Sequence, residues 1–369
     1  MTIPLPPVPP FLKIQGERPI TPDQQRRMAL TLACHDCDEL PRVSEAGSVH
    51  EQGEWPVQIM HNGLRMALHC YYGPWNTQLV EKLRGHHEPQ EEKAFAHVLS
   101  LLGNAQLMVE LGAYWSYYSL WFRKCFPDAK SILVEPDPHC LEIGQYNFAL
   151  NGCTGEFVHA AVAANSGVEP SFFCETDGVT RTVDLVSVDQ LLHDQPRADI
   201  ILADIQGAEW SMLQGMSRTL AAGKARIVII STHHANLTGD YLTHEKCLDF
   251  LRGHGAVILA EHTVEESYSG DGLIVASFDP TITAPIEISY CRARDSWFGL
   301  PSGYQQTALE ANRAANKAQA QLGAVSQKLA GIKKEYAAHV KSLENQLEYH
   351  SVNPARALRL WWNRFRTKF

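Results

Sequence analysis

The sequence predicts an α/β protein with a doubly wound, seven-stranded, Rossmann-like sheet. From residue 107 onward, short apolar segments alternate with amphipathic segments of helical period, which is typical of βαβ units. The first two apolar segments end in acids, Glu110 and Glu135, and Gly112 follows the first. Because ligands of open α/β sheets bind where strands end, we expect a nucleotide-like ligand at this edge.

The apolar segments predict where the strands lie. They cover residues 107–111, 131–135, 156–162, 199–204, 226–231, 256–260 and 272–277. Helices are expected in the gaps, and the βαβ rhythm predicts a parallel sheet. Another helix should precede the sheet, from Pro89 to about Leu102, since proline and acidic residues suit a first helical turn.

Two segments are expected ahead of this helix. Residues 1–20 are rich in proline and predict an extended arm. Residues 21–89 form an N-terminal extension, in which two segments of period-two alternation flank Asn62-Gly63. This dipeptide accepts the positive φ angles of a type I′ turn, so we expect a β-hairpin between 57–59 and 64–68.

Residues 303–350 predict a long helix that forms a coiled coil. Apolar or small side chains recur there at heptad spacing, at Ala308, Ala311, Ala315, Ala318, Leu322, Val325, Leu329, Ile332, Tyr336, His339 and Leu343. We therefore expect a homo-oligomer held together by this helix, and a single helix folded back on the preceding domain is the alternative.

Residues 354–369 predict a basic amphipathic tail. The chain has a net charge of −9, yet this segment has five cations and no acidic side chain. Its apolar residues recur every three or four positions, at Leu358, Trp361, Trp362 and Phe365. The tail suits peripheral contact with an anionic membrane, and docking onto a protein is the alternative.

Composition excludes several classes of protein. The acidic net charge argues against nucleic acid as a partner, and no apolar segment reaches the length of a membrane-spanning helix. The N-terminus does not resemble a secretory signal, so we expect a cytoplasmic protein. Peripheral association would then be with the inner face of the membrane. Cys34 and Cys37 have metal-ligand spacing, but no second pair accompanies them and no metal is expected.

The ends of the first two predicted strands, at residues 111 and 135, together predict an adenosine site. Of a glycine-rich loop only Gly112 remains, with Tyr114 and Ser116 in the other glycine places. Glu135 follows after about 20 residues, the spacing at which a carboxylate binds ribose hydroxyls in such a unit. An NAD-dependent oxidoreductase is less favoured, because the first turn lacks GxGxxG.

Four blocks of sequence then resemble, in chain order, those of FkbM-like methyltransferases. They are Val109-Glu-Leu-Gly-Ala-Tyr-Trp-Ser-Tyr-Tyr-Ser-Leu120, Val134-Glu-Pro-Asp-Pro138, Val183-Asp-Leu-Val-Ser-Val-Asp189 and Ala203-Asp-Ile-Gln-Gly-Ala-Glu209. The resemblance covers about residues 90–280 and implies a methyltransferase domain over 90–300. It implies S-adenosylmethionine (SAM) as cofactor and methylation of oxygen, commonly on sugars. Ala203 and Gln206 depart from the lysine and glutamate that the family usually has there.

These observations select the cofactor-binding residues. They are Glu110, Gly112, Ala113, Tyr114, Ser116, Tyr117, Glu135, Pro136, Asp137, Asp204 and Gln206. Two further segments, residues 86–92 and 267–272, are expected either to contact the ligand or to be an ordinary helix start and loop.

The catalytic residues should follow the fourth and fifth strands. Methyl transfer to a hydroxyl needs alignment of the oxygen and removal of its proton. We expect Asp204 to orient His233 or His234 as the base. A divalent ion held by Asp204, Glu209 and one histidine is the alternative.

We therefore expect an O-methyltransferase that acts on a hydroxyl of a saccharide or glycosylated metabolite. The alternative is a non-catalytic SAM-binding scaffold that recruits partners through its coiled coil and basic tail.

Overall fold

The fold was analysed in a computed structural model. It describes residues 4–51, 53–291, 321–323, 325–345 and 354–366. The chain divides into two compact units, Met1–Arg292 and Ala293–Phe369. The predicted extension and the predicted domain share the first unit, and the boundary between them at residue 90 stays a prediction.

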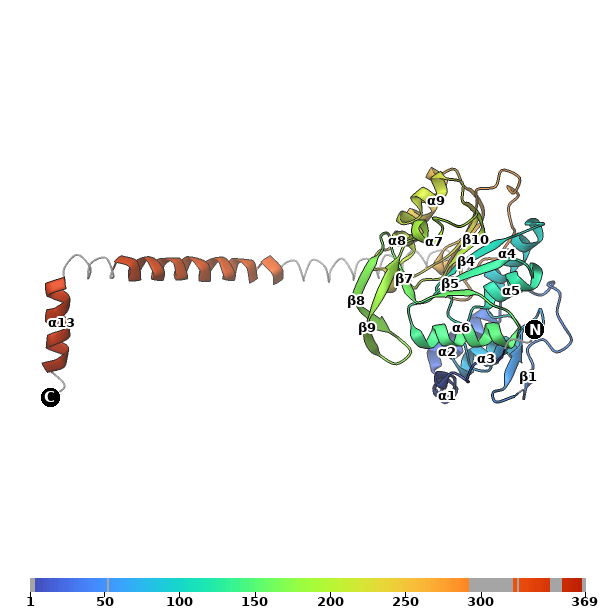
Figure 1. The fold of residues 1–369 in the computed structure, drawn as a ribbon, viewed down its shortest axis with the longest axis horizontal. Helices are drawn as coiled ribbons and strands as arrows, with labels where there is room; N and C mark the ends of the chain where they lie inside the picture. The colour runs from blue at the N-terminus through green and yellow to red at the C-terminus, as the bar shows by residue number, and fades with distance from the viewer. Residues whose placement is uncertain (1–3, 52, 292–320, 324, 346–353, 367–369) are drawn as a thin grey trace. The chain divides into compact units, whose positions relative to one another are not determined.

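A seven-stranded sheet forms the centre of the first unit (Figure 1). Its strand order is β12-β13-β11-β10-β4-β5-β6. Its strands are β4 (Leu107–Leu111), β5 (Lys130–Val134), β6 (Glu156–Val158), β10 (Ala198–Ala203), β11 (Ala225–Thr232), β12 (Val257–His262) and β13 (Gly272–Ser277). Each overlaps one of the seven predicted strands. The α/β class and the strand number are therefore as the sequence predicts.

Helices cover both faces of this sheet. They are α4 (Pro89–Leu101), α5 (Tyr117–Cys125), α6 (Pro138–Leu150), α8 (Glu209–Gln214), α9 (Ser217–Ala221), α10 (Ala235–Thr238) and α11 (Thr243–Gly253). Successive strand residues enter different cores, since Met108 packs with the cluster around α4 and α5 while Val109 packs with the cluster around α8 and α11. A strand buried on both faces is expected to be apolar throughout, which is why β4 and β10 were recognisable.

The sheet is mixed, so the prediction of a parallel sheet was wrong at one edge. β13 pairs antiparallel with both β11 and β12. Between β12 and β13 the chain has residues 263–271, with one short 3-10 helix, η1 (Val264–Glu266). This connection is shorter than the crossover of about a dozen residues that a parallel pair requires.

The predicted strand 156–162 is also interrupted, at His159. Its second half, β7 (Ala160–Val162), leaves the main sheet and joins a smaller sheet of order β7-β9-β8. β8 (Gly167–Cys174) and β9 (Val179–Val186) form a hairpin before the short helix α7 (Val188–Leu191), where we expected only helix. Most hairpin side chains are exposed, so the hydrophobic alternation that marks a strand is weak there.

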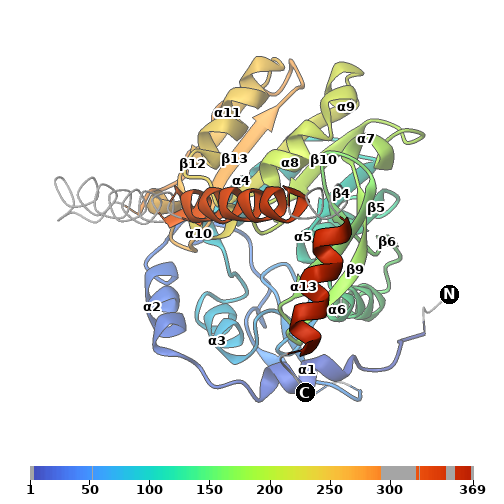
Figure 2. The same ribbon diagram turned by 90° about the vertical axis from the view of Figure 1, so that its left-hand side faces the viewer.

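The N-terminal residues are more structured than predicted. α1 (Pro10–Gly16) replaces the extended arm over residues 10–16, because Phe11 and Leu12 bury their side chains in the core and Pro10 suits the first helical position. α2 (Pro22–Thr31), β1 (Val49–His50), β2 (Val57–Ile59), β3 (Arg65–Ala67) and α3 (Pro74–Lys82) follow. The helices of this extension lie together beside one side of the sheet (Figure 2).

β2 and β3 form an antiparallel pair, to which β1 adds a third strand. The turn between β2 and β3 is not type I′, since Gly63 has a positive φ of 81° and Asn62 does not. Asn62 instead accepts the Leu64 N–H through its side chain at 3.1 Å.

The second unit is helical wherever it is described. Residues 321–323 and 325–345 are helical and exposed, and α13 (Pro354–Arg366) follows. The predicted heptad positions from Ala308 to Ala318 lie outside the described residues. Within the described ranges, no helix is both long and apolar enough to cross a lipid bilayer.

Candidate active site

A cavity of about 370 Å³ lies at the carboxyl ends of β4, β5 and β10. Its walls include seven residues predicted to bind the cofactor, namely Gly112, Tyr114, Glu135, Pro136, Asp137, Asp204 and Gln206. The remaining walls come from residues 11–72 of the N-terminal part of the chain, from α6, β7 and the β8–β9 hairpin, and from the turn after β10. The cavity has the size of small-ligand sites and the position predicted for such a sheet.

Gly112 allows two turns of this edge to meet. Its φ is 77°, and a Cβ built on it would lie 1.8 Å from the carbonyl oxygen of Asp204. A side chain at residue 112 would therefore collide with the turn after β10. The glycine is required by the contact between the β4–α5 and β10–α8 turns.

The β4–α5 turn has the positive φ angles that are typical of a glycine-rich loop, although the residues that adopt them are not glycines. Tyr114 and Ser116 have φ angles of 36° and 63°, in the left-handed region that L-residues rarely occupy. Gln206, in the opposite turn, has φ 49°. The Tyr114 hydroxyl and Gln15 lie 3.1 Å apart, and the Tyr114 N–H donates to Glu135 at 2.9 Å. Such strain clusters at ligand sites, which supports a ligand in this cavity.

Glu135 is placed to bind two hydroxyl groups. Its carboxylate oxygens accept the backbone N–H groups of Tyr114 and Asp137, each at 2.9 Å. One lone pair on each oxygen therefore remains for a ligand. Burial raises the pKa of Glu135 to about 7, and the two N–H groups limit the rise.

His233 lies among three carboxylates at the end of β11. Its Nδ1 is 2.6 Å from Glu209, while its Nε2 is 3.2 Å from Asp204 and 3.6 Å from Asp271. Burial disfavours the imidazolium, but the bonds to Asp204 and Glu209 and the nearby charges outweigh burial and raise the pKa of His233 well above its usual value. His233 is therefore a cation in this arrangement, which does not suit the role of base that we expected.

His234 faces a different environment. Its Nδ1 accepts the Asn236 N–H at 3.1 Å and caps α10. The structure therefore brings Asp204 and His233 together as predicted and leaves His234 outside the group. The alternative metal clamp is not supported either, because the His233 ring lies between Glu209 and Asp204.

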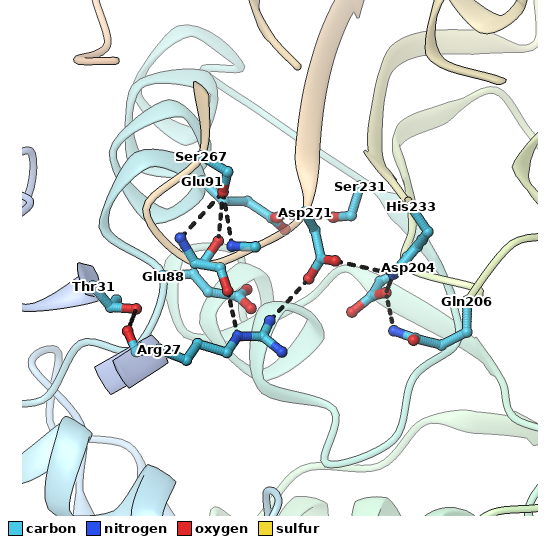
Figure 3. A network of polar contacts seen from close by, with 12 residues as sticks. Arg27, Thr31, Glu88, Glu91, Asp204, Gln206, Ser231, His233, Ser267 and Asp271 are labelled. Atoms are coloured by element: carbon cyan, nitrogen blue, oxygen red, sulfur yellow. Dashed lines mark hydrogen bonds and ion pairs between the residues drawn. The ribbon is translucent and has the colours of Figure 1, made fainter. Parts of the chain in front are cut away.

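The polar network around Asp204 and His233 contains two residues that the sequence did not predict as site residues, Arg27 and Asp271 (Figure 3). Arg27 of α2 lies 3.3 Å from Asp271, which begins the turn into β13, and also donates to the Ser269 carbonyl. A polar loop had been noted at residues 267–272, but no local pattern marks Arg27. Glu91 of α4 accepts from the Ser231 hydroxyl at 2.8 Å beside the same group.

Comparisons with known proteins agree with this geometry. Residues 93–258 match the family described as Methyltransferase FkbM domain. The chain carries an FkbM methyltransferase domain. No curated protein matches the chain significantly.

Solved methyltransferase structures also align with the chain. They include precorrin-6y C5,15-methyltransferase from Geobacter metallireducens, with 16% identity, TM-score 0.32 and coverage of 50% of this chain and 87% of that one. Magnesium protoporphyrin IX methyltransferase from Synechocystis PCC 6803, with bound SAM, has 11% identity, TM-score 0.35 and coverage of 52% and 80%. Ribosomal protein L11 methylase from Lactobacillus delbrueckii subsp. bulgaricus has 13% identity, TM-score 0.32 and coverage of 53% and 81%.

The cofactor of the FkbM domain is SAM, and the cavity fits it. Glu135 has one free lone pair on each oxygen, as two ribose hydroxyls would require, and the left-handed turn at Tyr114 brings backbone close to the same carboxylate. Gln206 donates to Asp204 at 3.0 Å, so the departure from glutamate at this position supplies a donor to the neighbouring carboxylate.

Four predicted cofactor residues do not line the cavity of the FkbM domain: Glu110, Ala113, Ser116 and Tyr117. Glu110 points under α5, where it accepts the Ser119 N–H at 3.0 Å, and burial raises its pKa to about 8. The Tyr117 ring stacks on Trp115 at 5.1 Å. Alternate residues of a strand face opposite sides of the sheet, which explains why Glu110 is beneath the helix and not at the strand end.

Cys34 and Cys37 have different hydrogen-bond partners. Cys34 lies 3.6 Å from the Ser289 hydroxyl, and Cys37 donates to the Pro89 carbonyl at 3.2 Å. Among the described residues, one group of metal-ligating types converges, Cys37 with His86 and Glu92. Glu92 already accepts from His86 at 2.5 Å and from the His87 N–H at 2.7 Å. We interpret it as the carboxylate that anchors the start of α4.

Proposed function

We propose that this protein is a SAM-dependent O-methyltransferase that acts on a hydroxyl of a saccharide or glycosylated metabolite. One observation carries the proposal: Asp204 lines the cofactor cavity and also contacts His233 on the acceptor side. SAM supplies an electrophilic methyl group on its sulfonium. The chain must then position a hydroxyl oxygen and receive its proton.

We infer that a carboxylate, and not His233, receives the proton. His233 is held as a cation by Asp204 and Glu209, so it positions Asp204 and stabilises its negative charge. Asp271, at 3.6 Å from His233, has a pKa raised to about 6, because burial outweighs the attraction of the His233 charge. A carboxylate with this pKa is ionised at neutral pH and basic enough to accept a proton as the oxygen is methylated.

A polyhydroxylated acceptor suits the chemistry around this group. Asp204, Asp271 and Glu88 offer acceptors for hydroxyl donors, and Arg27 offers donors for hydroxyl oxygens (Figure 3). The Tyr71 and Tyr72 rings pack together at 4.6 Å beside the cofactor turn, and Tyr72 lines the cavity. The resemblance to FkbM-like enzymes, which commonly methylate sugars, supports the same class of acceptor.

The test is to incubate the protein with methyl-labelled SAM and glycan fractions of its own host. We expect label in a saccharide fraction, at an alkali-stable ether, and at least a hundredfold less label with Asp204→Asn. Label in a protein or lipid fraction alone would contradict the saccharide acceptor.

The scaffold alternative is supported by the second unit. Leu322, Val325, Leu329 and Ile332 expose 53–71% of their surface on the helix of residues 321–345, at heptad spacing. A second copy of the same helix would bury this stripe, so we propose that the chain self-associates there. A rise in melting temperature with SAM, combined with no transfer of label to any fraction, would favour the scaffold over the enzyme.

We further propose that α13 contacts an anionic membrane surface. Leu358, Trp361 and Trp362 expose 60–68% of their surface, and the helix carries only basic charges. Tryptophan and arginine on one short helix favour the headgroup region of anionic lipids. Flotation with vesicles of anionic and of neutral lipid should retain the intact chain on anionic vesicles only, and a chain ending at Asn353 on neither. Equal behaviour of both chains would contradict membrane contact.

A further inference from the structure

Two segments distant in the sequence meet beside the cofactor cavity. The first includes α1 and Arg18, within residues 1–20, and the second is the turn of the β8–β9 hairpin around Thr176. Arg18 donates to the Thr176 carbonyl at 2.9 Å, although the two residues lie 158 positions apart. Phe11, Arg18 and Thr176 all line the cavity.

Both segments are anchored to the chain that follows Glu135. The Thr176 hydroxyl lies 2.9 and 2.7 Å from the two carboxylate oxygens of Asp137. The Phe11 ring stacks on His139 with 5.2 Å between ring centroids and 19° between planes. The guanidinium of Arg18 covers Phe11 at 5.3 Å. The contacts therefore converge within four residues of the carboxylate that suits the ribose.

This end of the cavity has the chemistry of a nucleoside site. Phe11, Phe172, Phe173 and Val162 supply apolar walls, and Glu135 supplies the hydroxyl acceptors. Asp204 and Gln206, which also line the cavity, are polar, and Asp204 contacts His233. The flat adenine ring therefore fits among these apolar walls, which include Phe11, with its ribose on Glu135.

We propose that Phe11, Arg18 and Thr176 form a wall of the SAM site that contacts the nucleoside half of the cofactor, and we call these three residues the nucleoside clasp. The inference rests on the proposed function in requiring that SAM binds this cavity. It adds that the site is incomplete without the N-terminal residues, since Phe11 and Arg18 lie outside the matched region 93–258.

Two variants of the intact chain test the nucleoside clasp. Arg18→Ala removes an exposed side chain, so the fold should not change. Phe11→Leu keeps an apolar side chain and removes the flat ring. The matched control is Ile14→Ala, on the same helix, because Ile14 is 55% exposed and does not line the cavity.

Calorimetric titration uses two probes, S-adenosylhomocysteine (SAH) and adenosine. Because adenosine is the nucleoside half of SAH alone, the two probes show which half of the cofactor a residue contacts. Each clasp variant should raise the Kd of both probes by the same factor, about 3- to 10-fold, the size expected for one lost hydrogen bond or ring contact. Ile14→Ala should bind both probes as the unmodified chain does. Melting temperatures without ligand establish that the variants are folded.

Three results would overturn the clasp. An unchanged Kd for SAH in a folded Arg18→Ala variant and in Phe11→Leu would remove both residues from the site. A weaker Kd for SAH with an unchanged Kd for adenosine would place them at the wrong end of the cofactor. If the unmodified chain binds neither probe, the proposed function itself fails and the clasp fails with it.

Discussion

Substitution of Glu135 by alanine tests the cofactor site most directly. Each oxygen of Glu135 accepts one backbone N–H and keeps one lone pair, so the carboxylate can accept both ribose hydroxyls. A hydrogen bond to a charged group contributes about 1.5 to 3 kcal/mol. Loss of even one such bond should raise the Kd for SAH by about 10- to 150-fold.

The measurement is calorimetric titration with SAH at pH 8, with Asp189→Asn as the matched control. The Asp189 carboxylate also accepts two backbone N–H groups, from Arg218 at 3.2 Å and Thr219 at 2.6 Å, but it does not line the cofactor cavity. The control should bind SAH normally. Unchanged affinity in a folded Glu135→Ala variant would refute the assignment of the ribose carboxylate.

The same carboxylate predicts how binding depends on pH. Burial raises the pKa of Glu135 to about 7, so the acceptor charge is present above that pH and is lost as the pH falls through it. Binding by the ionised form alone should weaken about tenfold from pH 8 to pH 6. The Glu135→Ala variant should lose this dependence, and an equal slope in both proteins would assign the titration to another group.

Three further predictions follow from particular contacts. Gly112→Ala should lower the melting temperature and the affinity for SAH, because the new Cβ would meet the Asp204 carbonyl. The control is Gly152→Ala: residue 152 has a similar φ of 64°, but its Cβ would have no atom within 4 Å, so the free energy of unfolding should fall by only about 1 kcal/mol. Turnover is measured with the acceptor identified by labelling. His233→Ala should lower turnover about 10²- to 10⁴-fold, while His234→Ala, which removes a helix cap, should retain most of it. Equal losses in the two variants would contradict the placement of His233, and not His234, beside Asp204. In sedimentation, the intact chain should be larger than a monomer and a chain ending at Ser302 monomeric; equal monomeric mass for both would exclude self-association through the helix of residues 321–345.

Strands were predicted correctly from the sequence where their side chains are buried, and they were missed where the side chains are exposed. β4 and β10 are buried on both faces and read as continuous apolar segments, so their positions were predicted within one residue. β8 and β9 expose most of their side chains and gave no such pattern. The helix α1 was missed because Phe11 and Leu12 are stabilised by a core built from distant residues, and not by helical propensity of a proline-rich segment.

By itself the sequence determined where the apolar strand segments lie, the turn at Gly112 and the position of Glu135 after a strand. These depend on interactions between near neighbours, and the spacing of strand, turn and helix is visible in the order of residues. The sequence also placed Asp204 and His233 at neighbouring strand ends, since adjacent parallel strands end at one edge.

Only the tertiary structure decided the chemistry at that edge. Arg27 and Asp271 lie 244 positions apart, yet they meet beside His233. The protonation of His233 follows from its three carboxylate neighbours, and the pKa of Glu135 follows from its burial. Charge state depends on solvent exclusion and on the distance to other charges, which arise when segments remote in sequence pack together.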